Sequence, residues 1–141
     1  LKDIFYLVIR DEARHVTFGV NYLEEFVKTL SEEEKNDRAQ FAYEACVVMR
    51  NRFGSTNVVN HYGWDAEAAV EAQVGSEAGR LFSNLLFSKI MPNLKKIGLL
   101  NDEVSEKYEE MGILEFKDLD DATVTDWDEM SKPLEYEYST A

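Results

Sequence analysis

The sequence predicts an all-α chain, and three observations lead to that prediction. Apolar residues recur at spacings of three and four along most of the chain up to Gly112, as they do in amphipathic helices. Residues typical of helix N-caps precede several of these runs, and glycine or proline follows them. The 141 residues suffice for one domain with a hydrophobic core, and a hydrophobic content of 45% is ordinary for a globular protein.

The first helix is expected over residues 1–30, and its pattern singles out one face. The residues that share this face are Ile4, Val8, Glu12, His15, Gly19, Tyr22 and Phe26. Because most of them are apolar, we expect the face to be buried, with Glu12 and His15 at its middle. A carboxylate and an imidazole three residues apart point the same way, with Cβ atoms about 5–6 Å apart.

Burial of Glu12 and His15 would cost free energy unless a partner satisfied both groups. A transition metal such as iron or manganese is one such partner, because it suits a mixture of carboxylate oxygen and imidazole nitrogen. A hydrogen bond between the two side chains, or from His15 to a backbone carbonyl, would satisfy them without a metal. Asp11 can orient a nearby metal-bound histidine, and Gly19 leaves room for a close neighbour.

The run from Arg10 to Gly19, RDEARHVTFG, resembles the last metal-binding helix of the ferritin-like di-iron carboxylate proteins. It is most similar to the branch that holds the ribonucleotide reductase small subunit, the ligand-binding oxidases and the di-iron N-oxygenases. The implied fold is a four-helix bundle in which two helices each supply one Glu and two others each supply a Glu-x-x-His. The resemblance implies that Glu12 and His15 are metal ligands, and that Asp11 hydrogen-bonds the metal-bound histidine of the opposite motif.

By this resemblance the chain is the C-terminal portion of a non-haem di-iron, or Fe/Mn, oxidoreductase that activates O2 to oxidise a small-molecule substrate. The sequence lacks a second Glu-x-x-His, because Val58 stands three residues before the other histidine, His61. The remaining ligands are therefore expected from missing N-terminal helices of the same protein or from a homodimer. The alternatives are a ferroxidase or iron-storage relative and a non-catalytic helical dimerisation domain.

The second helix is expected over residues 32–53. Ser31 and Glu34 form a capping box at its start, and Gly54 ends it. The short turn before it predicts that the first two helices are antiparallel neighbours. The expected apolar face holds Phe41, Ala45, Val48 and Met49. Glu44 falls on the same face. We expect its carboxylate to point to solvent or to pair with an arginine, rather than to bind a metal. Cys46 is expected to be a buried, inert thiol.

The later part of the chain is predicted to form a loop followed by three shorter helices. The loop covers residues 55–63, and His61 is expected there as a surface or packing residue. Asp65 caps a short helix over 66–74, and a further helix over 76–91 starts at Ser76 and is interrupted by Pro92. Asn101 caps the last helix, which ends at about Gly112.

We divide the chain into a helical ferritin-like part, residues 1–114, and an acidic, aromatic-containing C-terminal tail, residues 115–141. The tail combines an excess of Asp and Glu with weak periodicity, which is typical of a loose segment. Its aromatic residues Phe116, Trp127, Tyr136 and Tyr138 predict that part of it docks on the body of the protein or on a partner.

The charge and cysteine content limit the partners and the compartment. The chain has 28 acidic and 15 basic residues and a formal net charge of −13. This charge disfavours nucleic acid or an anionic membrane as a partner, since both need basic surfaces. The single cysteine excludes an internal disulfide and favours a cytoplasmic location. No apolar run approaches the roughly 20 residues of a membrane span.

Overall fold

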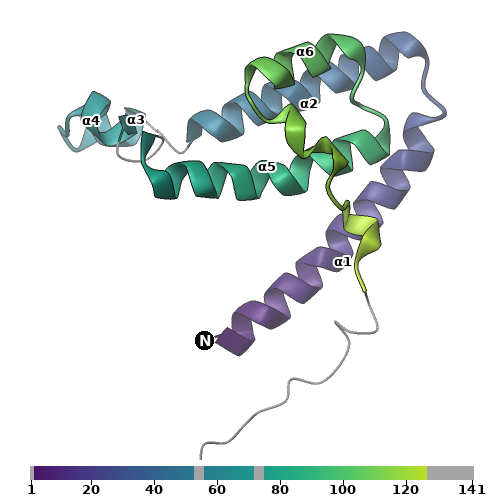
Figure 1. Cartoon of the computed structure of the whole chain (residues 1–141), viewed down its shortest axis with the longest axis horizontal. Helices are drawn as coiled ribbons and strands as arrows, with labels where there is room; N and C mark the ends of the chain where they lie inside the picture. The colour runs from purple at the N-terminus through teal and green to yellow at the C-terminus, as the bar shows by residue number, and fades with distance from the viewer. Residues whose placement is uncertain (1, 53–55, 72–74, 127–141) are drawn as a thin grey trace, which may run out of the picture.

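A computed structural model describes residues 2–52, 56–71 and 75–126, and this part of the chain is helical without strands, which confirms the all-α class (Figure 1). The α-helices are α1 (Lys2–Val27), α2 (Glu32–Arg52), α3 (Thr56–His61), α4 (Ala66–Val70), α5 (Glu77–Ile97) and α6 (Asp102–Glu110). Two 3₁₀ helices follow, η2 (Leu114–Asp118) and η3 (Ala122–Val124).

The predicted N-caps are confirmed, and they fix where the helices begin. At the start of α2, the Ser31 backbone N–H donates to the Glu34 carboxylate over 2.8 Å, and the Glu34 N–H donates to the Ser31 hydroxyl over 3.3 Å. Asp65, Ser76 and Asn101 cap α4, α5 and α6 by accepting hydrogen bonds from backbone N–H groups three residues ahead. These local hydrogen bonds satisfy donors that the first helical turn leaves without a partner.

Two local predictions were wrong. Pro92 does not interrupt the helix, because α5 continues through it to Ile97 and ends at Gly98, whose φ is 87°. The proline removes one backbone hydrogen bond, but Pro92 is buried beside Met91, and this packing offsets the loss. Residues 56–61, expected in a loop, form α3 instead, and His61 lies exposed at its end.

The main core lies where α5, α2, α6 and η2 meet. Phe87 and Met91 of α5 and Tyr108 of α6 are fully buried there, and Cys46 of α2 is also buried, as predicted. The rings of Tyr43 and Tyr108 meet edge to face, with centroids 5.5 Å apart. Helix α5 packs on η2, and α6 packs on both η2 and α2, so the buried residues of these four elements form one cluster.

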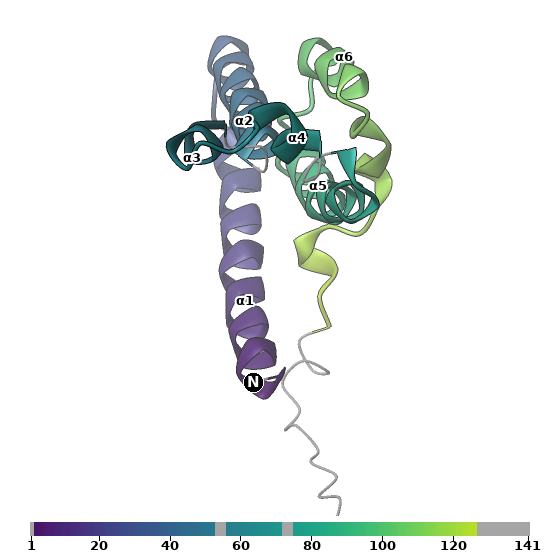
Figure 2. The ribbon, with the colours of Figure 1, turned by 90° about the vertical axis from the view of Figure 1, so that its left-hand side faces the viewer.

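The second core is smaller and joins α1 to α5. Val20 and Val27 of α1 pack with Ile97 of α5, and Leu30 and Leu99 lie against them. The antiparallel α1–α2 pair was wrongly predicted, because α1 and α2 diverge beyond their turn, and α1 packs on α5 and η3 instead (Figures 1 and 2). The N-terminal half of α1 extends away from the other helices in both views.

The predicted buried faces of α1 and α2 are exposed. On α1, Ile4 is 62% and Tyr22 61% exposed. The residues that pack, Val20 and Val27, lie about a third of a turn away around the helix, at 100° per residue. On α2, Phe41 is 68% exposed and α6 packs instead near Cys46. Both helices carry apolar residues on more than one side, so periodicity alone did not determine which side would pack.

The segment after α6 lies on the body of the protein as far as it is described. Helix η2 packs on α5 and α6, and η3 packs on α1 and α5. Lys95 of α5 pairs with Asp118 at the end of η2, with nitrogen and oxygen 2.6 Å apart. Residues 127–141 of the predicted tail lie outside the described residues.

Candidate functional site

Glu12 and His15 lie side by side on one turn of α1. The His15 Nδ1 atom is 3.6 Å from a Glu12 carboxylate oxygen. This proximity follows from the helix, in which residues three apart project from the same side. Both side chains are about two-thirds exposed, at 67% for His15 and 66% for Glu12. The pair therefore presents an oxygen and a nitrogen donor on the outer surface of α1.

The surroundings of the pair are apolar and exposed. Val8 lies about one turn before it and Tyr22 about two turns after it on the same side of the helix. The rings of Phe18, Tyr22 and Phe26 follow one another at centroid distances of 6.4 and 6.2 Å. Because α1 packs on α5 through Val20 and Val27, this row of rings is left without a neighbouring element in the described chain.

Neither Asp11, predicted to orient a metal-bound histidine, nor Glu44, for which a metal role was disfavoured, joins the pair. Within the described ranges no group of three or more His, Cys, Asp or Glu side chains is placed to hold a metal ion. Asp11 is exposed on α1, and Glu44 is exposed on α2, where it accepts a hydrogen bond from Gln40 over 2.8 Å. Glu12 and His15 thus supply two donors, which is fewer than an iron or manganese ion takes.

Cys46 has the inert environment expected of it. Burial raises the pKa of its thiol, and the Tyr108 hydroxyl lies 3.9 Å from its sulfur. Burial also raises the pKa of the Tyr108 phenol well above its ordinary value. Both groups are therefore neutral at physiological pH, which leaves no thiolate for nucleophilic chemistry.

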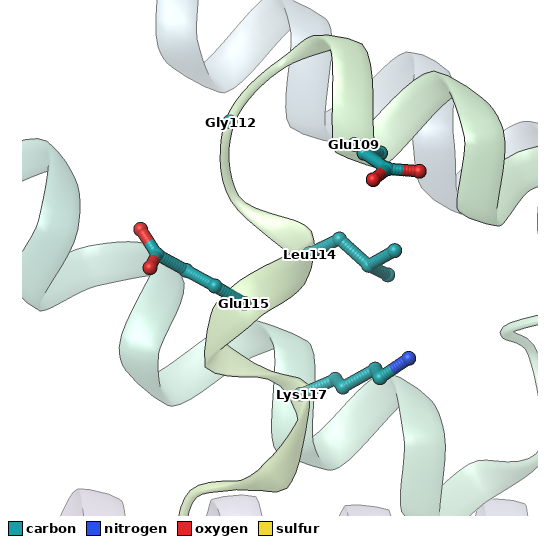
Figure 3. A pocket seen from close by; sticks show the side chains of 5 residues that line it. All are labelled: Glu109, Gly112, Leu114, Glu115 and Lys117. Carbon is teal, nitrogen blue, oxygen red and sulfur yellow. The ribbon is translucent and has the colours of Figure 1, made fainter.

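A shallow pocket of about 330 Å³ lies at the turn after α6, between Glu109 and Lys117. Figure 3 shows the Glu115 carboxylate on the opposite side of the ribbon from Leu114 and Lys117, while Glu109 extends from α6. The two carboxylates do not converge on one point. The pocket thus lacks the paired acids that metal binding or acid–base chemistry would use.

A larger groove, which the sequence did not predict, lies between α1 and α5. Its volume is about 490 Å³, and its walls are almost entirely apolar. Val16 and Val20 line it on α1, and Phe82 and Leu85 are among the residues that line it on α5. The feature of the sequence that could have indicated this groove is the pattern of α5, whose apolar residues occupy more than one side of the helix.

None of the helices within the described ranges is long and apolar enough to cross a membrane. The chain matches no family model, no curated protein and no solved structure.

Proposed function

We propose that α1 supplies the Glu-x-x-His part of a di-iron, or mixed iron–manganese, carboxylate centre in an oxidoreductase that uses O2 to oxidise a small molecule. One observation carries this proposal: Glu12 and His15 lie together in the middle of an exposed apolar helix face. An apolar face of this kind indicates a contact surface. Ligands at its centre would be enclosed once the face is covered.

The donor types of this pair fit such a centre, and the pair supplies two of its six protein ligands. Glu12 would give an anionic oxygen and His15 a neutral nitrogen. Asp11 would accept a hydrogen bond from a metal-bound histidine on the opposite helix. When bound, iron or manganese supplies the one-electron and O2 chemistry. The remaining ligands would come from further helices that cover α1, as in ferritin-like bundles.

The chain's own contribution to catalysis would be to position ligands and to exclude water. The helix holds Glu12 and His15 in a fixed relation, and Tyr22 lies on the same face. A covering helix would bury this apolar surface together with the ligands. Burial lowers the local dielectric and strengthens the hold of the carboxylate on a cation.

A second candidate function, non-catalytic dimerisation through α1, is favoured by the self-complementary pattern of the same face. If two copies lay antiparallel about a two-fold axis between residues 13 and 14, Glu12 would lie opposite the partner's His15. Val8 would lie opposite the partner's Gly19. A Cβ added at Gly19 meets no atom within 4 Å, so the space over it is open to such a side chain.

Titration with Mn²⁺, observed by NMR, tests the metal proposal on the chain itself. The protein has two histidines, His15 and His61, and both are exposed. Paramagnetic Mn²⁺ broadens the imidazole signals nearest to it, even when it binds weakly. We expect His15 to broaden at lower Mn²⁺ concentration than His61, because the Glu12 carboxylate lies 3.6 Å from His15, whereas no carboxylate within the described ranges pairs with His61. Glu12→Gln should remove this preference, whereas the matched variant Glu44→Gln should keep it.

Equal broadening of both histidines, or a preference for His15 that survives Glu12→Gln, would overturn the metal proposal. Sedimentation equilibrium tests the dimer separately. If α1 mediates it, Val8→Asp should yield monomers while Phe41→Asp, on the exposed side of α2, should not. A wild-type chain that stays monomeric at every concentration rules out the dimer and leaves the metal proposal standing.

A further inference from the structure

The N-terminal end of α1 forms an arm, residues 4–9, that projects from the body of the protein (Figures 1 and 2). Its exposed apolar side chains are those of Ile4, Phe5, Leu7, Val8 and Ile9. At 100° per residue, they cover about 200° of the circumference of the helix. A helix that packs on one neighbour needs an apolar stripe only about half as wide. The arm is therefore suited to a position between two neighbouring elements.

The groove between α1 and α5 offers two such elements. The two helices lie together near their C-terminal ends, where Val27 packs with Ile97, and they diverge toward their N-termini (Figure 1). The residues that line the groove lie on the N-terminal side of this contact. On the α5 wall Leu85 is 60% exposed, and on α1 the 62% exposed Ile9 lies two turns before Val16, which lines the groove. A helix inserted here would contact both α1 and α5.

Helix η3 holds the two walls of the groove together. The Ala122 carbonyl accepts a hydrogen bond from the Thr17 hydroxyl of α1, and the Ala122 N–H donates to the Asn93 side-chain oxygen of α5, each over 2.8 Å. Asn93 itself lines the groove, and Thr17 follows Val16. Because the walls are linked in this way, a helix can bind between them with little rearrangement, which lowers the cost of association.

A second copy of the chain can supply the helix that fits this groove. The arm cannot fill the groove of its own chain, because it belongs to the helix that forms one wall. If the arm of a second copy lay there instead, antiparallel to α1, a two-fold axis would place the first arm in the second groove. The two arms and the two grooves would then be covered by the same contact.

The charges of these two surfaces also favour a second copy. Each chain carries a net charge of −13, so two copies repel unless they meet through surfaces of little negative charge. The ionisable residues of segment 2–10 with a formal charge are Lys2, Asp3 and Arg10, which sum to +1. Lys89 is the one ionisable residue among those that line the groove. Neither surface is negative, so two copies can meet here with little repulsion.

We propose that this chain forms a two-fold dimer in which the α1 arm of each copy lies in the α1–α5 groove of the other. A stable interface buries about 800 Å² on each partner, which about a dozen apolar side chains reach if about 70 Å² of each is covered. This contact requires no metal. It differs from the α1–α1 dimer considered above because α5 supplies one of the two walls.

Sedimentation equilibrium of two variants tests the two sides of this contact. Ile9→Glu changes the arm and Leu85→Lys changes the groove, and both residues are exposed in the single chain, so both variants should fold, which circular dichroism checks. Each change occurs twice in the dimer, and a buried leucine or isoleucine contact is worth about tenfold in affinity. We therefore expect the dissociation constant to rise about 100-fold in each variant. The matched control Phe41→Glu, on the exposed side of α2, should leave it unchanged.

Mixing the two variants gives a sharper test of the reciprocal arrangement. A mixed dimer contains one unaltered arm in one unaltered groove, and its other half places a glutamate near a lysine. The equimolar mixture should therefore form dimers at a concentration at which each variant alone is monomeric. A mixture that stays monomeric there would overturn the proposal.

A wild-type chain that is monomeric at every concentration would overturn the proposal as well. A dimer that Val8→Asp dissociates but Leu85→Lys leaves intact would show that α1 alone forms the contact, which also rules out insertion into the groove. The Mn²⁺ titration of His15 reports on the metal proposal separately, so failure of one proposal is distinguishable from failure of the other.

Discussion

At the scale of single residues, Tyr108 is the largest of the fully buried side chains among the described residues. It is fully buried, contacts Tyr43 and Cys46, and belongs to α6, which is only nine residues long. So short a helix is not stable alone in water. Its position therefore depends on the apolar surface that Tyr108 and Val104 bury.

We expect Tyr108→Ala to lower the free energy of unfolding by about 3–5 kcal/mol, because it removes a buried ring and leaves a cavity. Phe41→Ala, which truncates an exposed ring, should change it by about 0.5 kcal/mol or less. Urea denaturation of both variants measures the difference. Equal effects would mean that the side of α2 that carries Phe41 is as buried as the core around Tyr108.

At the scale of the elements, two glycines have opposite roles. Gly98 ends α5 in the left-handed region, with φ at 87°, while Gly19 lies inside α1 with open space around it. Gly98→Ala should cost about 1–2 kcal/mol, because a side chain disfavours this conformation. Gly19→Ala should add up to about 1 kcal/mol of stability, because alanine is the better helix former.

Thermal unfolding of the two glycine variants, compared with the wild type, measures these opposite shifts. The contrast uses the same substitution in both places, so differences in side-chain size cancel. A stabilising Gly98→Ala would show that the end of α5 does not need the left-handed conformation. A destabilising Gly19→Ala would show that another segment lies close over that part of α1.

At the scale of the whole molecule, three acid groups link stability to pH. Each of them accepts hydrogen bonds that lower the pKa of its carboxyl group. The donor is Ser31 for Glu34, Lys95 for Asp118 and Thr123 for Asp121. A carboxyl group whose pKa is lower in the folded state stabilises the fold above its unfolded pKa. This contribution is lost as pH falls through the folded pKa.

Stability should therefore fall as pH decreases below the ordinary values of 3.8 for Asp and 4.5 for Glu. The double variant Asp118→Asn, Asp121→Asn should be less stable than the wild type at neutral pH and show a shallower acid decline. Urea denaturation of both proteins at several pH values between about 3 and 7 measures how steeply the free energy of unfolding of each falls with pH. Parallel declines in the two proteins would show that other groups carry the acid sensitivity.

The sequence predicted the local structure well where a side chain contacts its own helix. Ser31, Asp65, Ser76 and Asn101 act as caps because each needs only a backbone N–H two or three residues ahead. Gly98 closes α5 for an equally local reason. The Glu12–His15 proximity was also predictable, since helix geometry alone brings the pair together.

The sequence did not predict which surfaces meet. Pro92 lies buried inside α5 and does not end the helix. The exposed faces of α1 and α2 carry large apolar residues, such as Ile4 and Phe41, just as the packed faces do. The groove between Val16 and Leu85 joins residues almost seventy positions apart, and only the approach of α1 to α5 creates it.

For this protein, then, the sequence by itself determined the all-α class, the helix caps and the Glu12–His15 pair, because these depend on interactions within a few residues. Only the tertiary structure decided that α1 packs on α5 rather than α2, that the Glu12–His15 face stays exposed, and that Ala122 is held between the two helices. Those outcomes depend on competition among several apolar faces, which the pattern along one helix does not resolve.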